Sequence, residues 1–322
     1  MKETVINSVL QSRGVMVLFA IIAFVLSFYE WELISFPKEC VASGLLGDFY
    51  IPQFFDGTLG IILNYIGLVL IGVLMLMLNK QYLFLGNMSS LFVSLFLIFE
   101  MAIPAVGIQF CYCTYVVLIL MFLIIKLFST YNNTENHIGV FLIFATLSTL
   151  ATIEISAIYA MPLFVIGLWQ FRSISLRSGV AAILGILTPY WIILGLNIYP
   201  FDSLEFPTPT PIWELDSLPY WLPSSIFVLF ATIVSLAMNF FTLMKYKLRT
   251  RMYNSFIIFT LLWSIIMIII DCSNAAVYVT ILMACASMQI SHLYSVSSAK
   301  RRYIPLFLLI ALSIGIIISH MI

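Results

Sequence analysis

Residues 58–78 read TLGIILNYIGLVLIGVLMLML and contain no Asp, Glu, Lys or Arg. A helix that crosses the hydrocarbon core of a bilayer needs about 20 predominantly apolar residues. This stretch has the length and the composition of such a helix. Similar runs recur along most of the chain, and they decide its fold class.

The composition agrees with a membrane location. Hydrophobic residues make up 63% of the 322 residues, charged residues 9%, and the mean hydropathy is +1.12. A soluble domain has about 25% charged residues, so this chain could not cover its surface in water. We predict an all-α, polytopic transmembrane helix bundle that forms a single integral-membrane domain, 1–322. The net charge of zero gives no sign of a nucleic-acid partner.

Eleven apolar runs are long enough to be counted as transmembrane spans, the first of them uncleaved because no A-x-A-like site follows it. The predicted spans are 14–34, 58–78, 88–108, 111–129, 138–154, 156–171, 178–199, 224–244, 254–270, 275–293 and 304–320. The two larger loops, 35–57 and 197–224, then lie on the same side.

The basic residues set the orientation, because Lys and Arg collect in cytoplasmic loops. With a cytoplasmic N-terminus, every one of the 14 Lys and Arg residues except Lys38 falls at the inner face. Most acidic residues fall at the outer face. We therefore predict a periplasmic C-terminus. One alternative keeps this pattern: the pair 138–171 is a re-entrant hairpin, since removing two spans does not change the sidedness.

The outer loop 197–224 reads NIYPFDSLEFPTPTPIWELDSLPYWLPS and holds half of the chain's 12 prolines. Alternating prolines at 207, 209 and 211 favour a stiff, extended path. Trp213 and Trp221 suit the headgroup layer. The loop is either an ordered lid on the outer surface or a proline-stiffened connector.

Two acidic pairs flank this outer surface: Glu30 with Glu32, and Glu214 with Asp216. Neighbouring carboxylates are suitable ligands for Mg²⁺ or Mn²⁺, and a carboxylate can act as a general base. If the protein is an enzyme, these four residues are its candidate catalytic and metal-binding groups. The alternative is that outer loops are acidic simply because basic residues are excluded from them.

Two further acids lie within apolar runs. Glu100 stands about two-thirds of the way outward through the third span, and Glu154 stands at the outer end of the fifth. An ionisable residue inside a membrane segment is a candidate functional site. The alternative is a neutral glutamic acid bonded to a neighbouring hydroxyl, with Thr152 and Ser156 close to Glu154.

The strongest basic patch is the run Lys245, Lys247, Arg249 and Arg251. We predict that it contacts anionic lipid headgroups at the cytoplasmic face, with a protein partner as the alternative. Cys40 is close enough in this topology to Cys111 or Cys113 for a bridge, although cysteine as a small apolar helix residue is favoured.

The segment FLIFATLSTLATIEISAIYAMPLFVIGLWQFRSISLRSGVAAILGILTPYW (141–191) resembles an uncharacterised integral-membrane family of Bacteroidota. The shared features are an aromatic-Pro turn (Tyr159, Pro162), an inner loop with Arg172 and Arg177, and a helix ending near Pro189-Tyr190. The segment RTRMYNSFIIF (249–259) adds a basic loop leading into a late helix. The resemblance implies a bacterial inner membrane and no particular activity.

A more distant resemblance is to GT-C type membrane glycosyltransferases, which carry acidic residues in their first outer loop. Glu30, Glu32, Glu39 and Asp48 occupy that region here. The resemblance implies a polyprenyl-linked sugar donor at the periplasmic face. The chain departs from the pattern, because the loop has no Asp-Asp or Asp-Glu pair and no outer Arg that could bind the donor phosphate.

The sequence therefore predicts an inner-membrane protein of the bacterial cell envelope that serves as an accessory, binding or assembly subunit, with an envelope protein as partner. The first alternative is a GT-C-like enzyme acting on a lipid-linked glycan. The second is a small proton- or cation-coupled transporter in which Glu100 controls passage.

Overall fold

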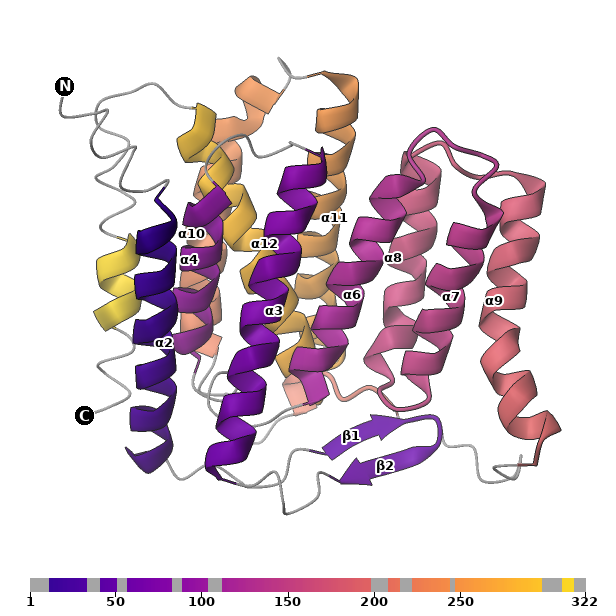
Figure 1. The fold of residues 1–322 in the computed structure, drawn as a ribbon, viewed down its shortest axis with the longest axis horizontal. Coiled ribbons are helices and arrows are strands. Elements are labelled where there is room, and N and C mark those ends of the chain that lie inside the picture. Colours follow the sequence, from indigo (N-terminus) through magenta and orange to yellow (C-terminus); the bar gives the residue numbers. More distant parts are fainter. Residues whose placement is uncertain are drawn as a thin grey trace.

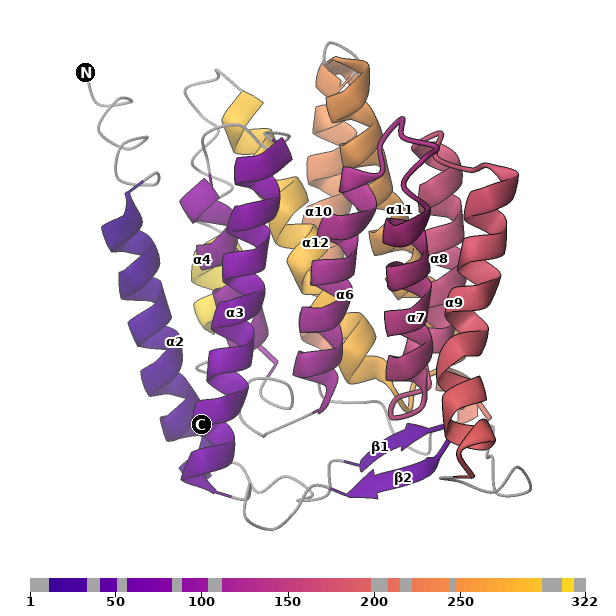
Figure 2. The same ribbon diagram turned by 45° about the vertical axis from the view of Figure 1, so that its right-hand side comes forward.

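The computed structural model describes residues 12–33, 41–50, 57–82, 89–103, 112–197, 208–214, 222–243, 247–296 and 309–315. These residues form a bundle of helices that run side by side, with one small β-hairpin across one end (Figures 1 and 2). The helices are α2 (Arg13–Leu33), α3 (Thr58–Tyr82), α4 (Ser89–Met101), α6 (Tyr112–Ser129), α7 (His137–Ala151), α8 (Ser156–Gln170), α9 (Leu176–Gly195), α10 (Leu222–Leu243), α11 (Leu248–Ile270) and α12 (Ala275–Val296).

Every predicted span contains a helix, and residues 309–315 form a helix within the last one. Among the described residues, five helices are long and apolar enough to cross a membrane: α3, α6, α9, α11 and most of α12. The short pair α7 and α8, which the sequence left open as a re-entrant hairpin, runs beside α6 and α9 over the same height of the bundle (Figure 1).

The helix at the basic run begins earlier than predicted. α11 starts at Leu248 rather than at residue 254, so Arg249 and Arg251 belong to its first turns. Arginine is a good helix former, and a helix does not have to end where the hydrocarbon layer does. The apolar stretch thus predicts only part of this helix and not its whole length.

A two-stranded antiparallel hairpin replaces part of what the sequence presented as an outer loop. Strands β1 (Val41–Gly44) and β2 (Gly47–Tyr50) pair with Val41 opposite Tyr50. Gly47 has a φ of 91°, in the left-handed region that glycine occupies without steric cost. We call the end of the bundle that carries β1 and β2 the hairpin end.

The core is built around α12, which packs against α4, α6, α10 and α11. Within the part of α12 long enough to span, 94% of the residues are buried. α9 is the opposite case, because it packs mainly on α7 and leaves most of its apolar surface exposed. Gly185 permits the close α7–α9 packing, since a Cβ there would stand 2.7 Å from the carbonyl oxygen of Phe141.

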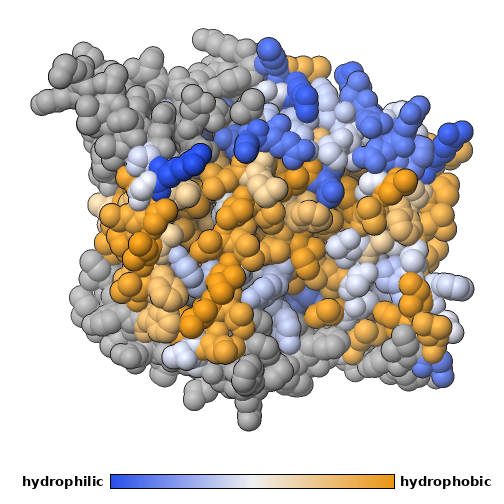
Figure 3. Space-filling model, in the orientation of Figure 1, coloured by the Kyte–Doolittle hydropathy of each residue, from blue (hydrophilic) through white to orange (hydrophobic). Residues whose placement is uncertain are grey.

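Space-filling colouring separates the surface into zones. A hydrophobic belt crosses the middle, and the most hydrophilic side chains gather along the end opposite the hairpin (Figure 3). We call that opposite end the basic end. The exposed large apolar side chains include Ile21, Val73, Leu187 and Ile266, from four different helices. Exposed apolar surface of this extent is expected where lipid, not water, surrounds a protein.

Candidate functional site

Charged side chains are distributed unevenly between the surface and the interior. Every Lys and Arg in the described ranges is exposed, and each lies near the basic end: Arg13, Lys80, Lys126, Arg172, Arg177, Lys247, Arg249 and Arg251. Three acids are buried instead: Glu100 and Asp271 have no exposed surface, and Glu154 is 4% exposed. These buried carboxyls are the strongest candidates for function.

Asp271 follows the last residue of α11 and accepts hydrogen bonds from three side chains. The Ser273 hydroxyl donates to Oδ1 at 2.7 Å, the Asn274 amide to Oδ2 at 2.9 Å, and the Tyr278 hydroxyl to Oδ2 at 2.7 Å. Hydrogen bonds donated to a carboxylate favour its ionised form. The α11–α12 turn thus positions Asp271 as an acceptor buried at the hairpin end.

Glu154 lies in the turn between α7 and α8, outside both helices. Burial raises the pKa of Glu154 to about 7; hydrogen bonding from Ser156 lowers it, and the nearby Asp271 carboxylate raises it. The Oε1 atom of Glu154 and the Oγ atom of Ser156 are both buried without a hydrogen bond of full geometry. Glu154 and Asp271 thus interact electrostatically from two turns that are distant in sequence.

Two segments cover these turns at the hairpin end. Backbone hydrogen bonds join the hairpin to the α7–α8 turn: Leu45 N to Ala151 O at 3.2 Å, Leu46 N to Thr152 O at 3.2 Å, and Ile155 N to Ser43 O at 2.9 Å. Thr210 covers the α11–α12 turn, where its carbonyl accepts from Cys272 N at 2.7 Å and its hydroxyl from Ser273 N at 3.2 Å.

The segment around Thr210 belongs to the predicted lid. Residues 208–214, including the short 3₁₀ helix η3 (Ile212–Glu214), lie against α11. The contact through Thr210 supports an ordered role for this part of 197–224 over a plain connector. The remainder of that loop lies outside the described residues.

Glu100 stands on the other side of the central helix. Both of its carboxyl oxygens are buried without a hydrogen-bond partner, and Thr280 of α12 is the polar side chain that interacts with it. Tyr278 and Thr280 are two residues apart, so they project about 200° apart around α12. Tyr278 donates a hydrogen bond to Asp271, whereas Thr280, on the opposite side of α12, interacts with Glu100.

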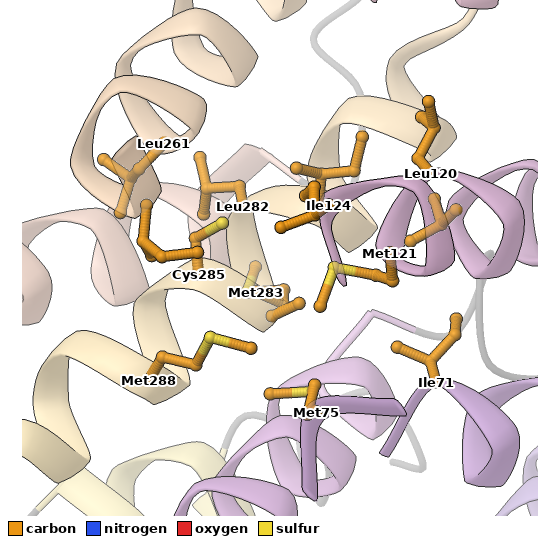
Figure 4. Packing of buried hydrophobic residues seen from close by; sticks show 14 of the residues in the cluster. Ile71, Met75, Leu120, Met121, Ile124, Leu261, Leu282, Met283, Cys285 and Met288 are labelled. Carbon is orange, nitrogen blue, oxygen red and sulfur yellow. The ribbon is translucent and has the colours of Figure 1, made fainter. Parts of the chain in front are cut away.

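An apolar layer separates these polar groups from the basic end. Thr280 and Ser287 are about 10 Å apart along α12, and the residues between them are Ile, Leu, Met, Ala and Cys. Methionine and branched side chains from four helices fill this level (Figure 4): Ile71, Met75, Leu120, Met121, Ile124, Leu261, Leu282, Met283, Cys285 and Met288. Beyond the layer, Gln289 donates to the Asn254 side chain at 2.9 Å.

The acidic pairs singled out in the sequence are placed only in part. Glu30 and Glu32 lie in the last turns of α2, and Asp216 lies outside the described ranges. Glu214 ends η3 and is exposed. Within the described residues, no group of three or more His, Cys, Asp or Glu side chains could hold a metal ion. The proposed shared Mg²⁺ or Mn²⁺ site remains a prediction.

The basic run has a structural role in addition to the predicted lipid contact. The guanidinium of Arg249 lies over the rings of Tyr82, Tyr131 and Tyr253, at 6.0, 5.7 and 5.5 Å from their centroids. Its Nε also donates to the Tyr253 hydroxyl at 2.8 Å. Arg249 thus joins α11 to α3 and to the end of α6. Lys247 and Arg251 are exposed, and Lys245 lies outside the described residues.

An apolar cavity and the buried cysteines are weaker candidates for a functional site than the buried carboxyls. An apolar cavity of about 400 Å³ lies between α2, α3 and α4, with Ile21, Val69 and Leu97 in its wall and none of the three buried carboxyls. Cys272 and Cys285 are free, buried thiols. Both bridges considered for Cys40 involve a residue outside the described ranges.

Asp271 and Tyr278 are the site residues that the sequence did not single out. Asp271 was counted only as one of many outer acids. The signal was local: an Asp directly after a long apolar run, followed by Ser273 and Asn274, which commonly hydrogen-bond within turns. The sequence offered no means of pairing Asp271 with Glu154.

Comparisons of the chain with protein-family models, curated proteins and solved structures found no match. The resemblances to a Bacteroidota membrane family and to GT-C enzymes therefore rest on the quoted residues alone.

Proposed function

We propose that the protein is a multi-pass protein of the bacterial inner membrane, with eleven spans, a cytoplasmic N-terminus and a periplasmic C-terminus. The support is that the described Lys and Arg residues gather at one end of the bundle, as the positive-inside rule requires of a cytoplasmic face. The hairpin end then faces the periplasm. Lys247 and Arg251 are available for anionic lipids at the opposite face.

Within that setting we propose that the protein is a small proton- or cation-coupled transporter. The observation that carries this proposal is the set of three buried carboxyls, Glu100, Glu154 and Asp271, in a bundle whose described Lys and Arg residues are all exposed. Buried acids with no basic partner bind protons or cations, because an isolated buried charge is costly. Intramembrane carboxyls of this kind mark ion pathways in many membrane proteins.

A purely structural role explains Glu100 less well. A packing role would be served by a residue of similar size without an ionisable group, such as Gln or Met. Each oxygen of Glu100 instead lacks a hydrogen-bond partner, and a buried polar atom left unsatisfied costs about 1–3 kcal/mol. Such a cost is typically retained where the group has a function.

The apolar layer of Figure 4 fits a transporter with a closed pathway better than an open channel. Glu100 has no exposed surface, so ions would reach it only after a conformational change. The methionines in the layer have flexible side chains that repack readily. Alternating access requires a barrier of this type between the two aqueous sides.

The test is ion flux in sealed vesicles containing the purified protein and a trapped pH-sensitive dye. An imposed proton gradient should dissipate faster with the wild type than in protein-free vesicles. Glu100→Gln should abolish the added flux, whereas Glu214→Gln, which removes an exposed carboxyl, should retain it. Wild-type vesicles that match empty vesicles under proton, sodium and potassium gradients would contradict the proposal.

The accessory-subunit reading remains the second candidate, and one observation favours it. α9 exposes large apolar side chains along its length, including Leu184, Leu187 and Trp191. A partner helix could cover that face as well as lipid does. Gentle release from the native membrane followed by native mass spectrometry would detect a stoichiometric protein partner. A bound polyprenyl-linked sugar in the same measurement would favour the GT-C reading instead.

A further inference from the structure

The turns at the hairpin end bring two acids together without a balancing cation. Glu154 interacts electrostatically with Asp271 and with Tyr278, and Asp271 also interacts with Tyr159. The α11–α12 turn and α12 supply the titratable groups that interact with Glu154, and Tyr159 of α8 interacts with Asp271. The nearby Cys272 thiol is neutral when protonated. The side chains of Asp48 and Tyr50 on β2 lie outside the described residues.

The hydrogen bonds distinguish the two carboxyls. Asp271 receives three donors, which stabilise its negative charge. Glu154 has one oxygen, Oε1, that no donor reaches, although the atom is buried. When two close carboxyls cannot both ionise, the one with poorer hydrogen bonding retains the proton.

A second observation points to the same position. The Ser156 hydroxyl has no exposed surface, acts on the Glu154 carboxyl, and makes no hydrogen bond of full geometry. Because a hydroxyl both donates and accepts, Ser156 can donate to an ionised Glu154 and can accept from a protonated one. The buried Ser156 hydroxyl thus gives Glu154 a local partner whether or not the proton is bound.

We propose that Glu154 and Asp271 form a proton-binding site at the hairpin end, which takes up one exchangeable proton on Glu154. Binding converts the Glu154 carboxylate into a carboxylic acid, and no other reactant is needed. The inference deepens the proposed transport function, since it rests on that function for its role, but proton occupancy itself does not depend on transport.

The two segments that cover these turns, the hairpin and the segment around Thr210, indicate where the proton would enter. The hairpin bonds the turn that holds Glu154, and Thr210 bonds the turn directly after Asp271. Both links consist of a few hydrogen bonds at the periphery of the bundle. Opening of either one would expose the pair to the hairpin side, whereas the apolar layer blocks the route to the basic end.

Infrared difference spectroscopy on the full-length protein in lipid nanodiscs tests the proposal directly. The wild type should show a protonated-carboxyl C=O band that disappears as the pH rises through about 7. Glu154→Gln should remove that component, and Glu154→Asp should keep a titrating band if the Gln variant fails to fold. Glu100→Gln should leave the component in place.

The neighbouring carboxylate provides the sharper control. Asp271→Asn should shift the midpoint of the Glu154 band to lower pH, because a negative charge that disfavours ionisation of Glu154 has been removed. A purely structural role for Asp271 predicts no such shift. The proposal is overturned if no titrating band depends on Glu154, or if the midpoint equals that of a free glutamic acid.

Sodium distinguishes a proton site from a metal-cation site. Replacing potassium with sodium at constant ionic strength should leave the midpoint unchanged. A sodium-specific shift would overturn the assignment and make the pair a sodium site. If the band behaves as expected but vesicles show no ion flux, the proton site stands and the transport function fails.

Discussion

Charged side chains are exposed at one end of the bundle and buried at the other. At the basic end, Arg249 is exposed and is held by the rings of Tyr82, Tyr131 and Tyr253. At the hairpin end, Glu154 and Asp271 are buried together with no Lys or Arg beside them in the described residues. An exposed cation needs only water and aromatic surface, whereas buried anions need protons, cations or donors. The difference places buried carboxyls at the hairpin end and exposed cations at the basic end.

The pH dependence of stability should test this contrast most strongly. The pKa of Glu154 is raised from its ordinary 4.5 to about 7, so the folded protein binds more protons than the unfolded chain between these values. The contribution of Glu154 to stability should fall as the pH rises through this window, by about 3 kcal/mol at 1.36 kcal/mol per pH unit.

The measurement is unfolding at a series of pH values for the wild type and Glu154→Gln in the same detergent. The difference between the two proteins isolates Glu154 from other titrating groups. The variant should have a flatter profile between pH 5 and pH 8. Parallel profiles would show that Glu154 titrates alike in the folded and unfolded states.

Asp271→Ala should give the next largest effect. It leaves the Tyr278, Ser273 and Asn274 donors without their acceptor, at about 1 kcal/mol for each bond. Relief of the repulsion with Glu154 offsets part of that loss, so we expect a net destabilisation of about 2 kcal/mol. Glu214→Ala, at an exposed carboxyl, is the matched control and should change stability by less than about 0.5 kcal/mol.

Gly44→Ala tests whether the hairpin is held tightly over the α7–α8 turn. A Cβ at Gly44 would clash with the carbonyl oxygen of Thr152, so the hairpin or the turn would have to move. We expect a loss of between about 1 and 2 kcal/mol, together with faster hydrogen exchange at Leu45 and Leu46. Gly179→Ala, with open space around the glycine, should be neutral or stabilising.

The smallest effect is expected at the basic end. Arg249→Ala removes contacts with three tyrosine rings and should cost about 1 kcal/mol, since exposed cation–π contacts are individually weak. Arg251→Ala removes the same charge from a position about 200° around α11 and should cost under about 0.5 kcal/mol. Equal effects of the two variants would mean that charge alone, and not the tyrosine rings, accounts for the role of Arg249.

Much of the fold could be predicted from the chain because membrane helices carry local signals. The run at 58–78 lies within α3, and its apolar length is sufficient evidence without knowledge of any neighbour. The hairpin was missed because its strands are only four residues long and are fixed by backbone bonds to the α7–α8 turn. Neither feature leaves an alternating pattern long enough to recognise.

The candidate site was predicted only in pieces. Glu100 and Glu154 were identified because an acid within an apolar run is conspicuous in any sequence. Asp271 and Tyr278 were not, because Asp271 stands at the end of its run, where an acid is ordinary, and a tyrosine in a helix is common. Arg249 was assigned to lipid contact, and its three tyrosine partners come from α3, α11 and the turn after α6.

The sequence by itself determined that this protein is a helical bundle with apolar segments of membrane-spanning length and with its basic residues concentrated in particular loops. Each of those properties depends on the residues of a single segment, so it can be predicted without knowing how the segments pack. Only the tertiary structure decided which acids meet. Glu154 and Asp271 approach each other because α7, α8, α11 and α12 pack with their turns at one end, and such packing depends on side-chain contacts between helices that no single segment encodes.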